Sequence, residues 1–145
     1  TLPIYLGTIA SEQYRGAEVK LELSDDLASI DLLLRPDRRG PFLSALQASG
    51  GQDQRYMLAL YAALAECAPR KANLMWLDEP FRNLAGDGKE RFLHHLVPLL
   101  RERVPTLESI FLISHDQEVL TQRQTFQHIW TVTRDDGGSH VGIGV

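Results

Sequence analysis

The alternation of apolar and polar residues changes its period along the chain, and each period predicts a different element. Residues 17–23 (AEVKLEL) alternate apolar and polar side chains, and residues 27–36 (LASIDLLLRP) are rich in aliphatic residues. These patterns are typical of strands, so the two segments predict a β-hairpin that turns at Ser24, Asp25 and Asp26. An antiparallel hairpin therefore opens the fold.

Two segments in the middle of the chain have the helical spacing of apolar residues. The first covers residues 53–66 and ends before Pro69, and the second covers residues 88–104. Recurrence every three or four residues places the apolar side chains on one face of each helix. The side chains predicted to point inward are Tyr56, Met57, Leu60, Ala63 and Leu64 in the first helix, and Phe92, Leu93, Leu96 and Leu100 in the second.

Two short apolar runs, residues 73–78 (NLMWLD) and 109–114 (SIFLIS), are typical of strands that are covered on both faces. Because a helix joins them, we expect them to pair in parallel through a right-handed crossover. Residues 126–134 and 139–145 flank the turn sequence DDGG and predict a closing hairpin. The expected fold class is α/β, with parallel central strands, flanking helices and antiparallel hairpins at both ends.

Composition indicates a single globular domain covering residues 1–145. The chain is 43% hydrophobic and 23% charged, and its net charge of −4 argues against a surface that is wholly devoted to nucleic acid. A single cysteine, Cys67, excludes an internal disulfide and favours a reducing compartment, so the cytoplasm is the expected location. No apolar stretch is long enough to cross a bilayer, and no membrane partner is expected. Because the chain begins at Thr1, without methionine, we expect a piece of a longer protein.

Polar side chains follow both predicted central strands. Asp78 and Glu79 end one strand, and Ser114, His115 and Asp116 end the other. Ligands of parallel sheets bind beyond these carboxyl ends. There, Asp78 offers an oxygen ligand for Mg²⁺, Glu79 a group that orients an attacking water, and His115 a donor to a phosphoryl oxygen. Taken singly, the same residues are also compatible with structural roles: Asp78 as a cap of the next turn, Glu79 as a solvated side chain and His115 as a surface residue.

A second site is predicted at the sequence ASGGQ, residues 48–52. Ser49, Gly50 and Gly51 precede a helix that we expect to begin near Gln52 or Asp53, and helix starts present N–H groups to anions. The glycines let the backbone approach a phosphate, and the Ser49 hydroxyl adds a donor. The alternative is that Ser49 only caps the helix while the glycines serve a turn.

In this order, the motifs ASGGQ, LMWLDEP and FLISHD resemble the signature motif, the Walker B strand and the switch-histidine loop of ABC-type ATPases. The resemblance covers most of the chain and implies a P-loop NTPase-like half-domain that uses ATP and Mg²⁺. It implies catalytic roles for Glu79 and His115 and a Mg²⁺ site at Asp78. It also implies that the ATP of a second subunit is bound by Ser49, Gly50, Gly51 and Gln52.

The chain contains no G-x-x-x-x-G-K-[ST] sequence, the motif that binds the α- and β-phosphates of ATP. In this respect the chain resembles the carboxyl-terminal lobe of an SMC/SbcC-type head, which a long coiled coil separates from the lobe that carries the Walker A motif. The two-strand lead-in of residues 17–36, the aliphatic helix QRYMLALYAALAE and the final hairpin resemble that group, and LDEP and SHD resemble its SbcC-type branch.

The SMC/SbcC resemblance implies a set of partners and a process. The expected partners are the Walker A-containing lobe of the same protein, a second head in a homodimer or heterodimer, DNA, and a nuclease. Two heads would sandwich two ATP molecules, and hydrolysis would release the pair during DNA repair or chromosome maintenance. The expected location is the cytoplasm, in association with the nucleoid, or the nucleus in a eukaryote.

The sequence departs from the family pattern at three places. Ala48 replaces the usual leucine of the signature, and Phe81 and Arg82 replace small or hydroxyl residues. The loop that usually reads Asn-Leu-Asp ends here in Ala85, and the nearest acid is Asp87. That substitution puts communication between two heads through this loop in doubt.

Three alternatives share the motifs. An ABC transporter subunit should carry an arginine in the middle of the signature helix, whereas this helix reads LALYAAL. A soluble ABC protein that acts on ribosomes is the second alternative. The third is a binding or structural module with degenerate motifs, which the presence of Asp78, Glu79 and His115 disfavours although Ala85 keeps it open.

Overall fold

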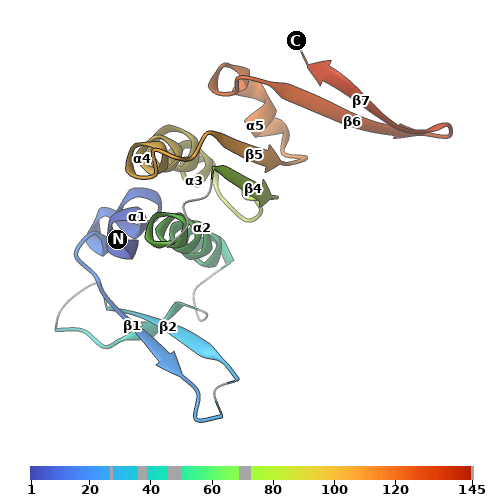
Figure 1. Cartoon of the computed structure of the whole chain (residues 1–145). Coiled ribbons are helices and arrows are strands. Elements are labelled where there is room, and N and C mark those ends of the chain that lie inside the picture. The colour runs from blue at the N-terminus through green and yellow to red at the C-terminus, as the bar shows by residue number, and fades with distance from the viewer. Residues whose placement is uncertain (27, 36–38, 46–49, 69–72, 145) are drawn as a thin grey trace. The chain divides into compact units, whose positions relative to one another are not determined.

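The computed structural model describes residues 1–26, 28–35, 39–45, 50–68 and 73–144. The chain divides into two units, residues 1–114 and residues 115–145 (Figure 1). The prediction that residues 1–145 act as one domain stays a prediction. None of the helices in the described ranges is long and apolar enough to cross a lipid bilayer.

The opening hairpin is confirmed. β1 (Glu18–Leu23) pairs antiparallel with β2 (Ile30–Arg35), and the short β3 (Leu43–Ser44) extends the sheet beyond β2. The turn lies where the DD sequence predicts it, because Ser24 N donates to Ser29 O at 3.0 Å and Ala28 N donates to Asp26 Oδ1 at 3.0 Å. Side chains with turn-forming chemistry therefore set the register of this pair.

A helix that the sequence analysis missed lies at the amino end. α1 (Leu2–Ile9) has Pro3 in its first turn, where the missing N–H has no partner within a helix. Tyr5, Leu6 and Ile9 are fully buried, and α1 packs against α2. A short 3₁₀ turn, η1 (Glu12–Tyr14), then leads into β1.

The long helix α2 spans Gly50–Cys67 and buries a different stripe from the predicted one. Tyr56 and Ala63 are buried as expected, but the remaining buried positions are Leu58, Ala59 and Ala62. Leu64, which was predicted to point inward, is 57% exposed, and Leu60 is only partly buried. The prediction fails there because α2 packs against α1 and also lines an apolar pocket together with β4, so its buried residues do not form one narrow stripe.

The central parallel pair is also confirmed. β4 (Leu74–Asp78) and β5 (Ser109–Ile113) pair in parallel, with Leu74 opposite Ser109 and Asp78 opposite Ile113. The predicted second helix joins them as α3 (Gly86–Arg91), η3 (Phe92–Leu96) and α4 (Val97–Arg103), and its four predicted core residues are buried. η3 is a π-helical stretch, and Pro98 explains it, because proline cannot donate to the carbonyl four residues earlier.

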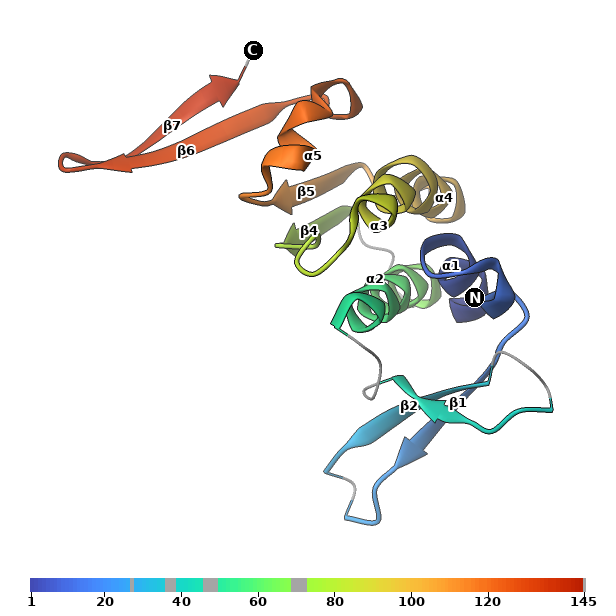
Figure 2. The same ribbon diagram turned by 180° about the vertical axis from the view of Figure 1, so that it is seen from behind.

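One face of the β4–β5 pair is exposed, contrary to the prediction that these strands are covered on both faces. Met75 and Leu77 point toward α2 and the α3–α4 segment, which lie beside β4 (Figure 2). Trp76, predicted to be strand core, is 60% exposed and stacks on Phe111 with the ring centroids 5.2 Å apart. Successive side chains of a strand alternate between faces, so covering one face leaves every second residue in solvent.

The second unit contains a short helix, a 3₁₀ turn and the closing hairpin. α5 (Gln117–Thr121) and η4 (Arg123–Thr125) precede β6 (Ile129–Asp135) and β7 (Gly138–Gly144), which pair antiparallel. Asp135 faces Gly138, so the loop has two residues, as the DDGG sequence predicts. Gly138 has a φ of +128°, a conformation that glycine tolerates best.

Three helices are tied together by one polar cluster. The Tyr5 hydroxyl of α1 donates to Glu66 Oε2 of α2 at 2.9 Å. Arg103 of α4 donates to both carboxylate oxygens of Glu66, at 2.7 and 2.6 Å. A bidentate pair of this kind is stronger than an ordinary surface ion pair. The hydrogen bonds from Arg103 hold the pKa of Glu66 below its usual value, whereas burial and the Glu66 carboxylate raise the pKa of Tyr5.

These shifts predict how the stability of the chain depends on pH. The Glu66 carboxylate stabilises the fold above its unfolded-state pKa of about 4.3, and this contribution is lost as the pH falls toward the lower folded-state value. We expect the free energy of unfolding, measured by urea titration, to fall more steeply below pH 4.5 for the wild type than for Glu66→Gln. Parallel curves for the two proteins would contradict this prediction.

Candidate active site

Two of the polar residues that follow β4 and β5, Glu79 and Ser114, meet within the first unit, as the parallel pairing predicts. Glu79 N donates to Ile113 O at 2.8 Å, which holds the backbone after β4 against the end of β5. The Ser114 hydroxyl lies 3.5 Å from Glu79 Oε2, the long limit of a hydrogen bond. Asp78 is exposed and Glu79 is partly buried. The two carboxylates therefore stand at the sheet edge where ligands of parallel sheets bind.

Glu79 has a backbone conformation that is unusual for its residue type. Its φ is +48°, in the left-handed region, and Asn83 in the same loop has a φ of +63°. The fully buried Pro80 follows Glu79, and Arg82 N donates to Glu79 O at 3.1 Å, closing a tight turn. Non-glycine residues with positive φ are uncommon, and strained positions of this kind cluster at functional sites.

The site fits Mg²⁺ by the chemistry of its donors. Mg²⁺ is usually held by one or two carboxylates, while phosphates and water complete its coordination. Asp78 offers one exposed carboxylate at the end of β4. In the described part of the chain, no group of three or more His, Cys, Asp or Glu side chains comes together as a metal cage. That Asp78 holds Mg²⁺ stays a prediction.

The helix at the signature sequence begins earlier than predicted. α2 begins at Gly50, so Gly50, Gly51 and Gln52 all belong to its first turn, whereas the sequence analysis placed the start near Gln52 or Asp53. Ser49 and Ala48 lie outside the described residues. The first four N–H groups of a helix have no acceptor within it, so first-turn glycines can present backbone donors to an anion.

The start of α2 is held against the segment that follows β4. Gln54 Nε2 donates to Pro80 O at 3.1 Å, and Arg55 Nη2 contacts both carboxylate oxygens of Asp87, at 3.0 and 2.9 Å. An open groove of about 480 Å³ runs between α2 and β4, with Asp78 and Trp76 in its wall. The sequence analysis missed these contacts because nothing in the spacing of Arg55 and Asp87 marks them as a pair.

His115 is exposed and is the first residue of the second unit, so its role with Asp78 and Glu79 stays a prediction. Its neighbour Asp116 has a structural role instead. Asp116 Oδ1 accepts hydrogen bonds from Glu118 N at 3.0 Å and from Val119 N at 3.4 Å, which caps the start of α5.

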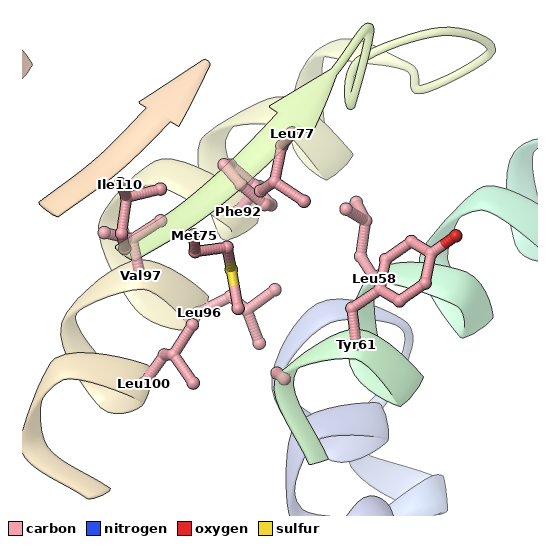
Figure 3. A pocket seen from close by; sticks show the side chains of 10 residues that line it. Leu58, Tyr61, Met75, Leu77, Phe92, Leu96, Val97, Leu100 and Ile110 are labelled. Atoms are coloured by element: carbon pink, nitrogen blue, oxygen red, sulfur yellow. The ribbon is translucent and has the colours of Figure 1, made fainter. Parts of the chain in front are cut away.

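A second pocket of the first unit is part of the apolar packing. Leu58 and Tyr61 of α2 face it from one side and Phe92, Leu96 and Leu100 from the other (Figure 3). All its lining side chains are apolar except Tyr61, so the pocket lacks the convergent polar groups that orient a ligand.

The departure at Ala85 allows a direct stability test. Ala85 is the N-cap of α3, its carbonyl accepts hydrogen bonds from Gly88 N and Lys89 N, and its methyl side chain cannot cap. Aspartate at an N-cap stabilises a helix by about 1 kcal/mol relative to alanine, which corresponds to a rise in Tm of about 3 °C. We expect Ala85→Asp to show this rise in thermal unfolding, and Ala85→Leu to show none. A lower Tm for Ala85→Asp would contradict the capping geometry.

Solved structures of SMC heads resemble the chain. A chain described under "Structural biochemistry of ATP-driven dimerization and DNA stimulated activation of SMC ATPases" is 18% identical, with a TM-score of 0.67 over 99% of this chain and 81% of that chain. The SMC head domain from Thermotoga maritima is 24% identical, with a TM-score of 0.60 over 99% of this chain and 46% of that chain. A Smc head with an extended coiled coil, bound to the C-terminal domain of ScpA from Pyrococcus furiosus, is 18% identical, with a TM-score of 0.63 over 98% of this chain and 34% of that chain.

These likenesses establish the fold. The chain has the α/β fold of an ABC-type ATPase head fragment, and its structural neighbours are SMC head domains. No family model and no curated protein matches the sequence. The chain spans 81% of the first of these structures but only 46% and 34% of the other two.

Proposed function

We propose that this chain is the carboxyl-terminal lobe of an SMC/SbcC-type ATPase head, which binds and hydrolyses ATP once a Walker A-containing lobe completes it. One observation carries the proposal. In a chain with the SMC head fold, α2 begins at the signature glycines, and the carboxylates of the Walker B-like sequence stand where β4 and β5 end together.

Each motif residue has a role under this proposal. Asp78 would hold Mg²⁺, and Glu79 would orient and polarise the attacking water. His115 donates a hydrogen bond to the γ-phosphate, where negative charge develops. Ser49 and the first turn of α2, Gly50 to Gln52, contact the γ-phosphate of ATP bound by a second head. ATP binding therefore joins two heads, and hydrolysis separates them.

Exposed apolar faces support the requirement for a further lobe. Parallel sheets are normally covered on both faces, and isolated two-stranded hairpins are marginally stable in water. Cross-strand pairing gathers apolar side chains on single faces of β1–β2–β3 and of β6–β7. The exposed members are Leu21, Leu23, Ile30 and Leu43 in the first sheet, Leu74 and Trp76 in β4, and Trp130, Val132, Val141 and Ile143 in the closing hairpin. Apolar patches of this kind mark interaction surfaces.

The biological setting rests on resemblance. One structural neighbour is described with ATP-driven dimerisation and DNA-stimulated activation, and another is bound to the C-terminal domain of ScpA. By analogy, we propose a second head as partner, DNA as the macromolecule acted on, and DNA repair or chromosome maintenance in the cytoplasm as the process. The LDEP and SHD sequences favour the SbcC-type branch, which would add a nuclease partner.

A second candidate is a catalytically degenerate head that has only a structural role. Ala85 favours it, because the acid that usually ends this loop is absent. Such a head would bind the other lobe without hydrolysing ATP.

One experiment separates the two candidates. The chain is mixed with the Walker A-containing segment of its own gene, and we measure phosphate release and association by light scattering, each with and without ATP and Mg²⁺. Hydrolysis together with ATP-dependent association supports the enzyme. If the two segments bind each other but show neither ATP hydrolysis nor ATP-dependent association, the result supports the structural head. The chain alone and the added segment alone are the controls.

A further inference from the structure

Two side chains in the first turns of α2 hold the segment that follows the Walker B-like carboxylates. Gln54 reaches Pro80 O, directly after Glu79, and Arg55 reaches both oxygens of Asp87, in the first turn of α3. The loop between Glu79 and Asp87 is therefore fastened to the same stretch of helix at both of its ends.

The Arg55 guanidinium also contacts the end of α1 and the backbone of α3. Its Nη1 donates to Ala10 O, at the end of α1, at 3.3 Å. A Cβ atom added at Gly88 would lie only 3.1 Å from Arg55 Nη2, so the guanidinium packs closely over the backbone of α3. The side chain of Arg55 is 16% exposed, and its hydrogen bonds hold the pKa of the Asp87 carboxyl below its usual range. Arg55 contacts Asp87 through one nitrogen, Nη2, and an ion pair with one shielded partner is stronger than a fully exposed pair.

We propose that Arg55 and Asp87 are positioning residues whose ion pair makes the amino end of α2 and the loop after Glu79 move as one body. The catalytic consequence rests on the proposed function: the phosphate-contacting turn of one head and its own catalytic carboxylate would keep a fixed separation. Asp87 is engaged by Arg55 of its own chain, so it does not replace the loop acid that is absent at Ala85.

The alternative is that the pair only stabilises the fold, and the chain contains a matched control for it. Arg103 and Glu66 form another arginine–carboxylate pair on α2, about 16 Å farther along the helix axis. Arg55→Lys and Arg103→Lys make the same substitution, which keeps the charge and removes the planar guanidinium. Arg55→Lys loses the hydrogen bond from Nη1 to Ala10 O that holds the Arg55 side chain in place, and Arg103→Lys loses the two-nitrogen contact with Glu66. A role in stability alone would give both variants similar properties.

The first test is amide hydrogen exchange on the chain itself, which requires no ATP hydrolysis. We expect Arg55→Lys to raise exchange at least threefold in residues 79–87 and in the first turn of α2, and Arg103→Lys to leave both segments unchanged. Asp87→Asn should cause less change when added to Arg55→Lys than it causes in the wild type, because both substitutions weaken the same ion pair. Unchanged exchange in residues 79–87 of Arg55→Lys, or equal changes in both lysine variants, would overturn the proposal.

The second test measures ATP hydrolysis by the head completed with its Walker A segment. We expect Arg55→Lys to lower kcat about tenfold with KM for ATP within about twofold, because a misplaced loop impairs chemistry more than binding. Arg103→Lys should retain wild-type kcat and KM. Equal kcat values for Arg55→Lys and wild type would overturn the catalytic consequence. A wild-type head without hydrolysis would instead count against the proposed function, and the exchange test still decides the coupling.

Discussion

Replacing Glu79 by glutamine is expected to slow ATP hydrolysis by the completed head about 100-fold or more, because the amide cannot accept a proton or polarise water as a carboxylate does. The change preserves the size of the side chain. It also preserves the backbone at Glu79, since Glu79 N donates to Ile113 O and the following turn closes on Glu79 O. We therefore expect ATP binding to persist. Phosphate release should fall while light scattering shows a long-lived ATP-bound dimer.

Glu66→Gln is the matched control for this experiment. It makes the same chemical change in a partly buried carboxylate of the same unit, which Arg103 and Tyr5 hold away from the ends of β4 and β5. Hydrolysis by Glu66→Gln should equal that of the wild type at neutral pH. If Glu79→Gln retained more than a tenth of the wild-type rate, Glu79 would not be the residue that activates water, and the proposed mechanism would fail.

Local chemistry made several elements predictable from the sequence. The alternation in residues 17–23, the DD turn and the DDGG turn each specify a hairpin within a few residues, and both hairpins form. The two apolar runs joined by a helix specify a parallel pair, whose register then brings Asp78 opposite Ile113. The meeting of Glu79 with Ser114 follows from that register, so this part of the candidate site could be predicted without a structure.

Features that depend on long-range packing could not be predicted. α1 has one buried turn near the amino end, too short for its periodicity to be informative. The exposure of Trp76 depends on which face of β4 the helices cover, and an apolar run does not encode that choice. The Arg55–Asp87 pair joins residues 32 positions apart, so it depends on where tertiary folding places α2 and α3. Ser49 lies outside the described residues, and the roles of Asp78, Glu79 and His115 in catalysis stay predictions.

Leu58 and Leu64 provide the sharpest test of the packing. The structure buries Leu58 and exposes Leu64, whereas the helical periodicity predicts that Leu64 points inward. Leu58 is 3% exposed and packs toward Met75 and Leu77 of β4, whereas Leu64 is 57% exposed (Figure 3). A leucine-to-alanine change costs about 2–5 kcal/mol in a core and about 0.5 kcal/mol or less at an exposed position. We expect Leu58→Ala to lower the free energy of unfolding in urea by the larger amount and Leu64→Ala by the smaller.

The urea experiment also distinguishes the reason for any difference. Unchanged m-values for both variants would place the effect in stability rather than in the extent of surface exposed on unfolding. Leu58 and Leu64 lie on the same helix, so their helix propensities contribute equally, and only the packing of the two side chains differs. Equal losses for the two variants would contradict the packing of Leu58, and a larger loss for Leu64→Ala than for Leu58→Ala would mean that α2 is rotated relative to β4. In that case the stripe predicted from the sequence, with Leu60 and Leu64 inward, would be correct.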